Sequence, residues 1–323
     1  MNRIAVLGSA TMDLIVRQAR LPRPGETMSG SGFSAVPGGA GVNQAVAAAR
    51  LGAVVDFLGM VGEDVHGAQL RLVLTREGID HEGLESTSRC SSSSSSEPTG
   101  TAHISVVDSG ENAIVVVSGA NAALTGLSRA QHDTIERAAF LVLQCELPVS
   151  VLAEGLAAAR SAGAFTVLAP APVIALPDGF LDLVDLIVPN QHEAAALTGE
   201  SDPVRAAELL SAGRTWAIVT LGAEGAVVAF DGAVLGLAPA RPGQGVDRAA
   251  VGDTFVGVLV ARLAAGAPRG WAGRAEPLRA GGITEAEMID AVRWATVAAS
   301  VSVSRPGGTT SMPTLAEVAA ILA

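Results

Sequence analysis

The chain of 323 residues contains no lysine, so all 21 of its cationic side chains are arginine. Schiff-base catalysis and the Walker phosphate loop both need a lysine amine, and this absence excludes them. If the protein handles phosphate, backbone amides and arginine side chains must hold it. The absence of lysine alone assigns no arginine a catalytic role.

Cysteine, clustered positive charge and long apolar runs are also scarce. Cys90 and Cys145 lie far apart and match no metal-ligand spacing, which argues against a disulfide framework or a zinc site. The net charge of −11 argues against a nucleic-acid partner. Apolar runs such as 54–60 fall short of the roughly 20 residues that span a bilayer, and the first residues form no cationic leader. We therefore expect a cytoplasmic protein without a membrane partner.

Apolar residues and glycine are abundant: 49% hydrophobic residues and 37 glycines indicate a well-cored globular protein. From residue 140 onward, expected strands alternate with helical segments, which is the pattern of a parallel sheet covered on both faces. The expected strands are 4–8, 54–59, 140–144, 165–168, 186–188 and 216–220. Extended segments near 16–33 and a hairpin at 102–117 interrupt this rhythm. The length allows one large α/β domain or two smaller ones, and we expect three α/β/α layers with a mainly parallel central sheet and a small β appendage.

The stretch 245–260 leads from small residues into an apolar helical segment, so 250–253 should form a helix N-terminus with free N–H groups. Such an end attracts anions. Asp253 lies in the first turn, where its carboxylate could take a proton from a substrate held against the same dipole. An ordinary acidic N-cap is the alternative.

Four sets of polar residues lie at strand or loop ends that could converge. They are Thr11 with Asp13, the loop 38–43, the segment 144–146, and Gly252 with Asp253. Carboxylates, an amide and exposed backbone suit a polyhydroxylated molecule held by many short hydrogen bonds. Each set also has an ordinary structural interpretation: a tight turn for the glycine loop, a surface or capping role for Asp13, and a strand-end charge for Glu146.

A second group of residues indicates a nucleotide. Asn190 follows an expected strand, and we expect it and Glu193 on adjacent helical turns that face one crevice. The loop 220–225 is rich in glycine, so its backbone can approach a phosphate closely. Glu193 could order a magnesium ion through water, or it could be only a first-turn helix acid. The five histidines have no partner at a ligand spacing and receive no role.

The order of these motifs resembles the ribokinase or PfkB family of carbohydrate kinases over nearly the whole chain. The motifs that match in order are 38–43, 190–193, 220–225 and 249–255. The segments that look closest to bacterial ribokinases are 8–9, 24–27, 41–47 and 118–124. The resemblance implies a single ribokinase-like α/β domain over 1–323 and ATP-dependent phosphorylation of a primary hydroxyl of a sugar.

The resemblance also implies roles for individual residues. Asp253 would accept the hydroxyl proton, and the amides of Ala250, Val251 and Gly252 would form the anion hole for the transferred phosphoryl group. The implied sugar-contacting residues are Thr11, Asp13, Gly39, Ala40, Asn43, Glu146 and Asp253. The implied ATP-binding residues are Asn190, Thr220, Gly222 and Gly225, with Glu193 for Mg²⁺. The implied residues around an activating monovalent cation, K⁺, are Asp247, Ala249, Ser302, Arg305, Gly307 and Ser311.

Three departures from ribokinases bear on the sugar. Thr11 and Ala169 stand where those enzymes typically have asparagine, and Ala40 stands where they have lysine. A polar site that loses a hydrogen-bond partner can discriminate against its former ligand. D-ribose is the leading substrate, while fructose, 2-keto-3-deoxygluconate and a nucleoside remain open. A non-catalytic sugar or nucleotide sensor is the alternative from another class, although the intact Asp253 motif argues against it.

The β appendage also acquires an expected role from the resemblance. Residues of about 14–36 and 101–119 would form a lid over the sugar site. Closing such a lid would exclude water that could otherwise take the phosphoryl group. The lids of two subunits pair in ribokinases, which implies a homodimer.

Overall fold

The computed structural model describes residues 2–87, 97–109, 111–241, 245–267 and 282–323. Cys90 lies outside these residues. The strands are β1 Arg3–Leu7, β2 Thr11–Gln18, β3 Gly32–Gly38, β4 Val54–Val61, β5 Leu84–Ser86, β6 Gly100–Val107, β7 Asn112–Val117, β8 Phe140–Gln144, β9 Phe165–Ala169, β10 Leu186–Ile187, β11 Trp216–Thr220, β12 Ala226–Phe230 and β13 Ala233–Ala238. The helices are α1 Ala40–Arg50, α2 Val65–Arg76, α4 Ala120–Ala123, α5 Arg129–Arg137, α6 Val149–Ala162, α7 Gln191–Thr198, α8 Pro203–Leu210, α9 Val251–Gly266, α10 Glu285–Ser302 and α11 Leu315–Leu322.

A large sheet organises the molecule. Within the described ranges it contains nine strands in the order β13-β12-β11-β10-β9-β8-β1-β4-β5. Strands from β5 across to β11 run parallel, and β12 and β13 complete one edge in antiparallel pairing. In this sheet β1 has β4 as its neighbour on one side and β8, which comes later in the chain, on the other, so the strand order reverses at β1. Ligands of open parallel sheets bind at such a reversal, outside the carboxyl ends of the strands.

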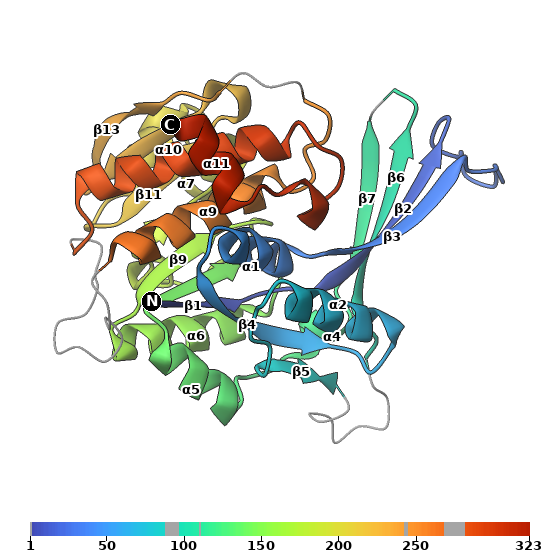
Figure 1. The fold of residues 1–323 in the computed structure, drawn as a ribbon, viewed down its shortest axis with the longest axis horizontal. Coiled ribbons are helices and arrows are strands. Elements are labelled where there is room, and N and C mark those ends of the chain that lie inside the picture. Colours follow the sequence, from blue (N-terminus) through green and yellow to red (C-terminus); the bar gives the residue numbers. More distant parts are fainter. Residues whose placement is uncertain (1, 88–96, 110, 242–244, 268–281) are drawn as a thin grey trace.

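Helices cover both faces of this sheet. Ile4 and Val6 of β1 belong to one buried cluster with α1 and α9, while Ala5 and Leu7 belong to a second cluster with α5 and α6. Alternation along a strand sends successive side chains to opposite faces, so both faces must be covered. Figure 1 shows α1, α9, α10 and α11 on one side and α5 and α6 on the other. The predicted three-layer α/β/α arrangement is confirmed.

A small second sheet projects from this body (Figure 1). It contains β3-β2-β6-β7 in that order among the residues described, with β2 antiparallel to β3 and parallel to β6. The predicted β appendage is therefore present as a separate sheet. Its strand β2 begins at Thr11, shortly after β1 ends, so this sheet starts beside the carboxyl end of β1, which lies between β8 and β4 in the large sheet.

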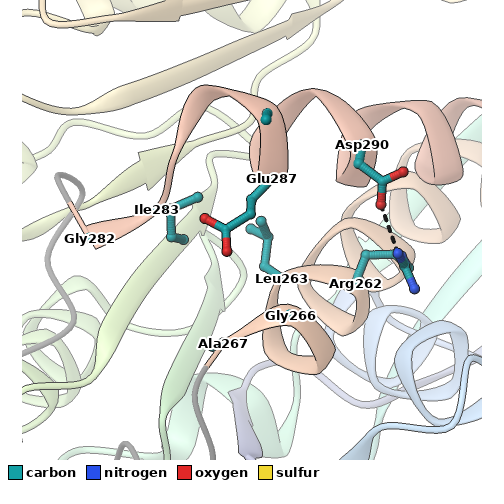
Figure 2. A pocket seen from close by; sticks show the side chains of 9 residues that line it. Arg262, Leu263, Gly266, Ala267, Gly282, Ile283, Glu287 and Asp290 are labelled. Carbon is teal, nitrogen blue, oxygen red and sulfur yellow. Dashed lines mark hydrogen bonds and ion pairs between the residues drawn. The ribbon is translucent and has the colours of Figure 1, made fainter.

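A hollow lies at the far end of α9, between that helix and the start of α10 (Figure 2). Leu263 and Ile283 line it, and Arg262 Nη2 donates to Asp290 Oδ2 at 2.7 Å on its rim. It lies at the opposite end of α9 from Asp253, and it brings together none of the residues that the sequence nominated for chemistry. In the described part of the chain, no helix is both long enough and apolar enough to cross a membrane.

Candidate active site

The first turn of α9 presents Asp253 to another helix rather than to its own backbone. Ala250 is the N-cap and supplies no side-chain cap. Asp253 Oδ2 accepts a hydrogen bond from Asn43 Nδ2 at 2.9 Å, and Oδ1 accepts one from Gln44 Nε2 at 3.0 Å. Both donors belong to the first half of α1. The carboxylate is therefore held at each oxygen by residues about 210 positions away in the sequence.

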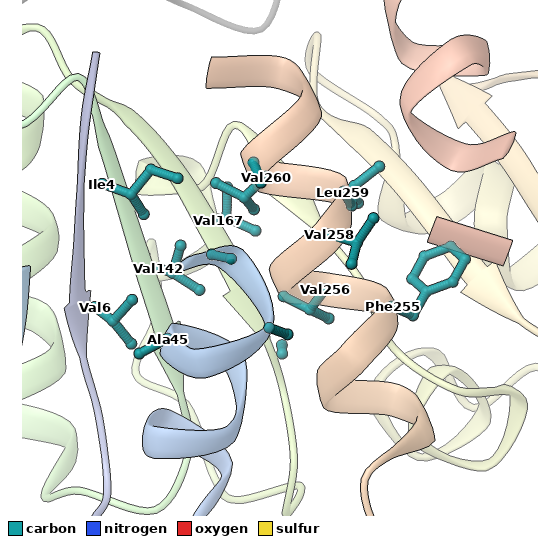
Figure 3. Packing of buried hydrophobic residues seen from close by; sticks show 14 of the residues in the cluster. Ile4, Val6, Ala45, Val142, Val167, Phe255, Val256, Val258, Leu259 and Val260 are labelled. Atoms are coloured by element: carbon teal, nitrogen blue, oxygen red, sulfur yellow. The ribbon is translucent and has the colours of Figure 1, made fainter. Parts of the chain in front are cut away.

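The close packing of α1 against α9 makes this contact possible. A Cβ at Gly257 would lie 2.5 Å from the Gln44 carbonyl oxygen and 2.6 Å from Ala47 Cβ. Figure 3 shows Val256 and Val260 of α9 directed toward the strands, with Ala45 of α1 between them and Val6. Only a glycine leaves room for the two backbones at this point. The glycine one turn after Asp253 thus brings that carboxylate within reach of α1.

Burial sets the acidity of Asp253. Desolvation raises the pKa of Asp253 to about 7, while the hydrogen bonds from Gln44 and Asn43 lower it and the charges of Glu146 and Asp13 raise it further. A general base works best when its pKa lies near the working pH. Asp253 is therefore suited to accept a proton at neutral pH.

Glu146 follows β8 and meets the loop after β1, the neighbouring strand. Glu146 Oε2 accepts hydrogen bonds from the hydroxyl of Ser9 and, at 3.2 Å, from the backbone N–H of Ala40. Ser9 Oγ in turn accepts from Gly41 N at 3.4 Å. The carboxylate of Glu146 is fixed at the start of α1, where the glycine loop makes its turn.

Asp13 supplies a third carboxylate from the small sheet. Thr11 Oγ1 donates to Asp13 Oδ1 at 3.3 Å, and Thr11 is buried. A Cβ at Gly38 would lie 2.2 Å from Asp13 Oδ1, and Gly39 has a φ of 92°, so the glycine pair lets β3 pass beside this acid. Desolvation raises the pKa of Asp13 to about 6, the Thr11 hydrogen bond lowers it, and the Glu146 charge raises it.

These three carboxylates lie close enough to influence one another electrostatically. Ionised carboxylates accept hydrogen bonds, so several of them suit a ligand with many hydroxyl groups. Asn43 Oδ1 is buried and has no donor among the described residues. The structure therefore brings together Thr11, Asp13, Gly39, Ala40, Asn43, Glu146 and Asp253, the residues predicted for the sugar.

The start of α9 also provides backbone donors. N–H groups of the first helical turn have no acceptor within the helix. Val251 N makes only a marginal contact, 3.5 Å, with Arg248 O, and Gly252 is exposed. These donors and the positive end of the helix dipole favour an anion in front of Ala250, Val251 and Gly252.

The region predicted for the nucleotide begins at α7. Asn190 Oδ1 accepts from Glu193 N at 2.9 Å, and Glu193 Oε2 accepts from Asn190 N at 2.8 Å, so the two residues form a capping box. The expectation that they lie on adjacent turns is wrong: Asn190 is the N-cap and Glu193 lies in the same first turn, because reciprocal capping closes both onto one end of the helix.

The glycine loop after β11 lies beside this helix start. Asn190 and Thr220 form a parallel bridge, which joins two of the predicted ATP residues. Gly222 and Gly225 have φ values of 60° and 106°, and a Cβ at Gly225 would lie 1.9 Å from the Ala238 carbonyl oxygen. Gly225 is therefore required for the turn itself, whereas the space around Gly222 is open.

The segments predicted for a monovalent cation also meet. Asp247 Oδ2 accepts from Gly307 N at 2.9 Å and Oδ1 accepts from Ala249 N at 3.0 Å. Ser302 Oγ and Ser311 Oγ are 2.7 Å apart and buried. The guanidinium of Arg305 instead pairs with Glu317. Hard cations prefer oxygen ligands. In Arg305 only the backbone carbonyl oxygen could therefore bind such a cation.

Three residues at the site had no assigned role in the sequence. Gln44 donates to Asp253, Ser9 donates to Glu146, and Gln144 Nε2 donates to Gln44 Oε1 at 2.7 Å. Gln44 and Ser9 lie in segments that resembled ribokinases, and Gln144 lies beside Glu146, but no spacing rule linked them. Only the fold reveals that these side chains meet.

A base suited to neutral pH, free helix N–H groups and carboxylates for hydroxyls together define the equipment of a small-molecule kinase, since phosphoryl transfer needs mainly positioning and charge stabilisation. A family model described as pfkB family carbohydrate kinase matches residues 1–315. The chain belongs to the pfkB family of carbohydrate kinases, and the resemblance found in the sequence is confirmed.

Similarity to known proteins extends over the full length. A ribokinase from Haemophilus influenzae is 35% identical over 324 residues, which cover 97% of this chain and 96% of that protein. A ribokinase from Bacillus subtilis is 34% identical over 323 residues, covering 100% of each chain. The structure of Arabidopsis thaliana ribokinase complexed with ribose and ATP matches with a TM-score of 0.85 at 27% identity, covering 99% of this chain and 98% of that one. The ribokinase-like fold is confirmed.

Proposed function

We propose that this protein transfers the γ-phosphoryl group of ATP to a primary hydroxyl of D-ribose. The observation that carries the proposal is the Asp253 carboxylate, held at both oxygens beside a helix N-terminus and near Glu146 and Asp13. Full-length similarity to ribokinases, one of them complexed with ribose and ATP, supports the choice of sugar and nucleotide.

In the proposed transfer, Asp253 accepts the proton of the primary hydroxyl. The hydroxyl oxygen then forms a bond to the γ-phosphorus, and the bond from that phosphorus to the β,γ-bridging oxygen breaks to release ADP. The N–H groups of Ala250, Val251 and Gly252 would stabilise the charge on the transferred group, as preorganised donors do. This arrangement needs no lysine.

The other hydroxyls of the sugar would be held by the remaining acids. Asp13 and Glu146 offer acceptor oxygens, and Asn43 offers the amide oxygen that lacks a donor within the described chain. Thr11 is turned toward Asp13, and Ala40 contributes only its backbone. We therefore propose that specificity rests mainly on the carboxylates.

The nucleotide would occupy the loops at α7 and β11. Asn190, Thr220, Gly222 and Gly225 would line its binding region. Bound Mg²⁺ would neutralise charge on the phosphates while keeping several water molecules of its hydration shell. Both Glu193 oxygens accept hydrogen bonds from Asn190, yet each keeps a lone pair that can hold a water molecule of the hydrated ion.

An activating K⁺ would lie between two loops, one with Asp247 and one with Gly307, which the hydrogen bond between these residues joins. Carbonyl and hydroxyl oxygens near Ala249, Ser302, Arg305 and Ser311 would surround it beside the anion hole. Turnover should then be faster with K⁺ than with a large organic cation at the same ionic strength. Equal rates in the two salts would contradict the cation site and leave the kinase activity untouched.

The substrate can be tested by measuring ADP formation against D-ribose, fructose, 2-keto-3-deoxygluconate and a set of nucleosides. We expect the highest kcat/KM with D-ribose. A higher value with another compound would assign the altered positions Thr11, Ala40 and Ala169 to a new specificity. Calorimetric binding of a sugar without ADP formation would instead identify a sensor.

The expected cytoplasmic location of the protein stays a prediction.

The small sheet would act as the lid of the sugar site and as a dimer interface. The edge strand β7 exposes four consecutive apolar side chains, Ile114 to Val117, each about half exposed. An apolar edge strand is a template for pairing with a second copy.

The dimer can be tested by sedimentation with Val116→Glu. We expect a dimer that this substitution converts to a monomer. Leu237→Glu is the matched control, because Leu237 is also an exposed apolar residue, on the edge strand β13 of the large sheet. A wild-type monomer, or equal effects of both substitutions, would contradict pairing through the lid.

A further inference from the structure

Behind Asp253 lies a chain of two buried glutamine side chains. Gln44 Nε2 donates to Asp253 Oδ1 at 3.0 Å, and Gln144 Nε2 donates to Gln44 Oε1 at 2.7 Å. Gln44 is 2% exposed and Gln144 is fully buried. The chain crosses from α9 through α1 to the last residue of β8, so it links the acid to the central sheet.

The ionised carboxylate dictates the direction of this chain. A carboxylate only accepts hydrogen bonds, so Gln44 must turn its NH₂ group toward Asp253 and its oxygen toward Gln144. That oxygen needs a donor, so Gln144 must present its own NH₂ group. The oxygen of Gln144 is then left over, and it has no donor in the described part of the chain.

The surroundings of the leftover oxygen make room for this arrangement. A Cβ at Gly8 would lie only 2.1 Å from Gln144 Oε1, so any larger residue would displace the amide. A buried polar atom without a partner costs free energy. Apolar side chains of similar size would avoid that cost, and their absence indicates that the amide chain does more than fill the core.

We propose that Gln44 and Gln144 are positioning residues, which point a hydrogen-bond donor at Asp253 and hold its carboxylate oriented and anionic for the transfer step. The inference rests on the proposed role of Asp253 as the base. Gln44 acts directly on Asp253, and Gln144 acts through Gln44 by preventing its amide from turning over. Asn43 remains as the donor to the other oxygen, while Glu146 and Asp13 are the charged groups that face Asp253.

The test is the dependence of kcat/KM on pH, measured for Gln44→Met and Gln144→Met from about pH 5 to about pH 9 with D-ribose and saturating ATP. Removing a donor destabilises the anion, so protonation occurs at higher pH and the acid limb moves upward. We expect a shift of about one pH unit for Gln44→Met and a smaller shift in the same direction for Gln144→Met. Titration of ATP is common to all variants and cancels in the comparison.

Gln131→Met is the matched control. Gln131 is also a fully buried glutamine, but its amide donates to the backbone oxygens of Gly59 and Gly83, away from Asp253. It should lower stability without moving the acid limb. An unchanged acid limb in both test variants, or an equal shift in Gln131→Met, would overturn the proposal.

A variant that does not fold and a failure of Asp253 as the base can both be told apart from a failure of the amide chain. If Gln44→Met does not fold, Gln144→Met decides alone, because it leaves both donors of Asp253 in place. Asp253→Asn is measured in parallel. If that variant keeps full activity, the role of Asp253 as base fails, whereas an inactive Asp253→Asn with unshifted glutamine variants contradicts only the amide chain.

Discussion

The starts of α7 and α9 look alike in sequence and differ in structure. Each carries an acid as its third residue, Glu193 in one and Asp253 in the other. Glu193 closes a capping box with Asn190 at its own helix end. Asp253 follows Ala250, which has no side chain to cap with, and its carboxylate is held by α1 instead.

The difference follows from the N-cap residue and from side-chain length. Asparagine at the N-cap accepts from the first-turn backbone, and the long glutamate reaches back to complete the box. Alanine at the N-cap leaves the shorter aspartate without a local partner. An acid that its own helix does not use is available for chemistry, provided that the fold supplies other partners.

The largest effect is expected from the loss of the Asp253 carboxylate. Asp253→Asn should lower kcat by roughly 10² to 10⁴ with little change in sugar binding, because a proton acceptor is lost while the shape is kept. The matched substitution Glu193→Gln should lower kcat by less than about tenfold and raise the Mg²⁺ concentration needed, as expected of a water-mediated contact. Steady-state kinetics with Mg²⁺ titration distinguishes them. Equal losses would place both acids in the same role.

The next prediction concerns the packing of α1 against α9 at Gly257, which brings Gln44 to Asp253. Gly257→Ala should lower the free energy of unfolding by about 3 kcal/mol and reduce kcat, because the new methyl group would meet the Gln44 backbone. Gly236→Ala is the control, since nothing lies within 4 Å of a Cβ placed there. Denaturant titration measures both. A harmless Gly257→Ala would mean that α1 and α9 have room to separate.

A third prediction concerns stability and pH. The pKa of Asp253 rises from 3.8 to about 7 on folding, so its contribution to stability is fully present below pH 3.8 and is lost as the pH rises to about 7. The advantage of Asp253→Asn over wild type in free energy of unfolding should therefore grow by on the order of 2 kcal/mol from about pH 5 to about pH 8. A constant difference across that range would show that the folded state does not raise this pKa.

The smallest effects are expected at the capping box of α7. Glu193→Gln should cost at most about 1 kcal/mol of stability, because a glutamine can still close the capping box. Asn190→Ala removes the N-cap acceptor and should cost about 1 kcal/mol, with a similar loss of thermal stability at low and neutral pH. Thermal unfolding checks both. A larger loss for Glu193→Gln than for Asn190→Ala would indicate that the carboxylate charge itself matters.

Much of the fold could be predicted because it depends on local patterns. The expected strands 140–144 and 216–220 agree with β8 and β11 at both ends. Apolar runs bounded by glycine and polar residues indicate buried parallel strands whatever their neighbours are. Asp231-Gly232, which forms the tight turn between β12 and β13 with positive φ at both residues, is likewise a local hairpin signal.

The site could be predicted only in part. Asp253, Glu146 and Asn43, which the structure brings together, could be nominated because each lies in a motif near a strand or helix end. Gln44 and Gln144 were not assigned roles, because their partners lie about 100 to 210 positions away and amide side chains carry no spacing signal. The adjacent-turn expectation for Asn190 is wrong because its side chain and that of Glu193 cap the same helix end reciprocally.

By itself, the sequence determined the alternation of strands and helices, the helix that begins near residue 250 and the acid in its first turn. These features depend on residues close together in the chain. Only the tertiary structure decided that Asp253, and not Glu193, receives partners from another helix. That choice depends on the approach of α1 to α9 at Gly257, where two backbones meet and bring Gln44 to the carboxylate.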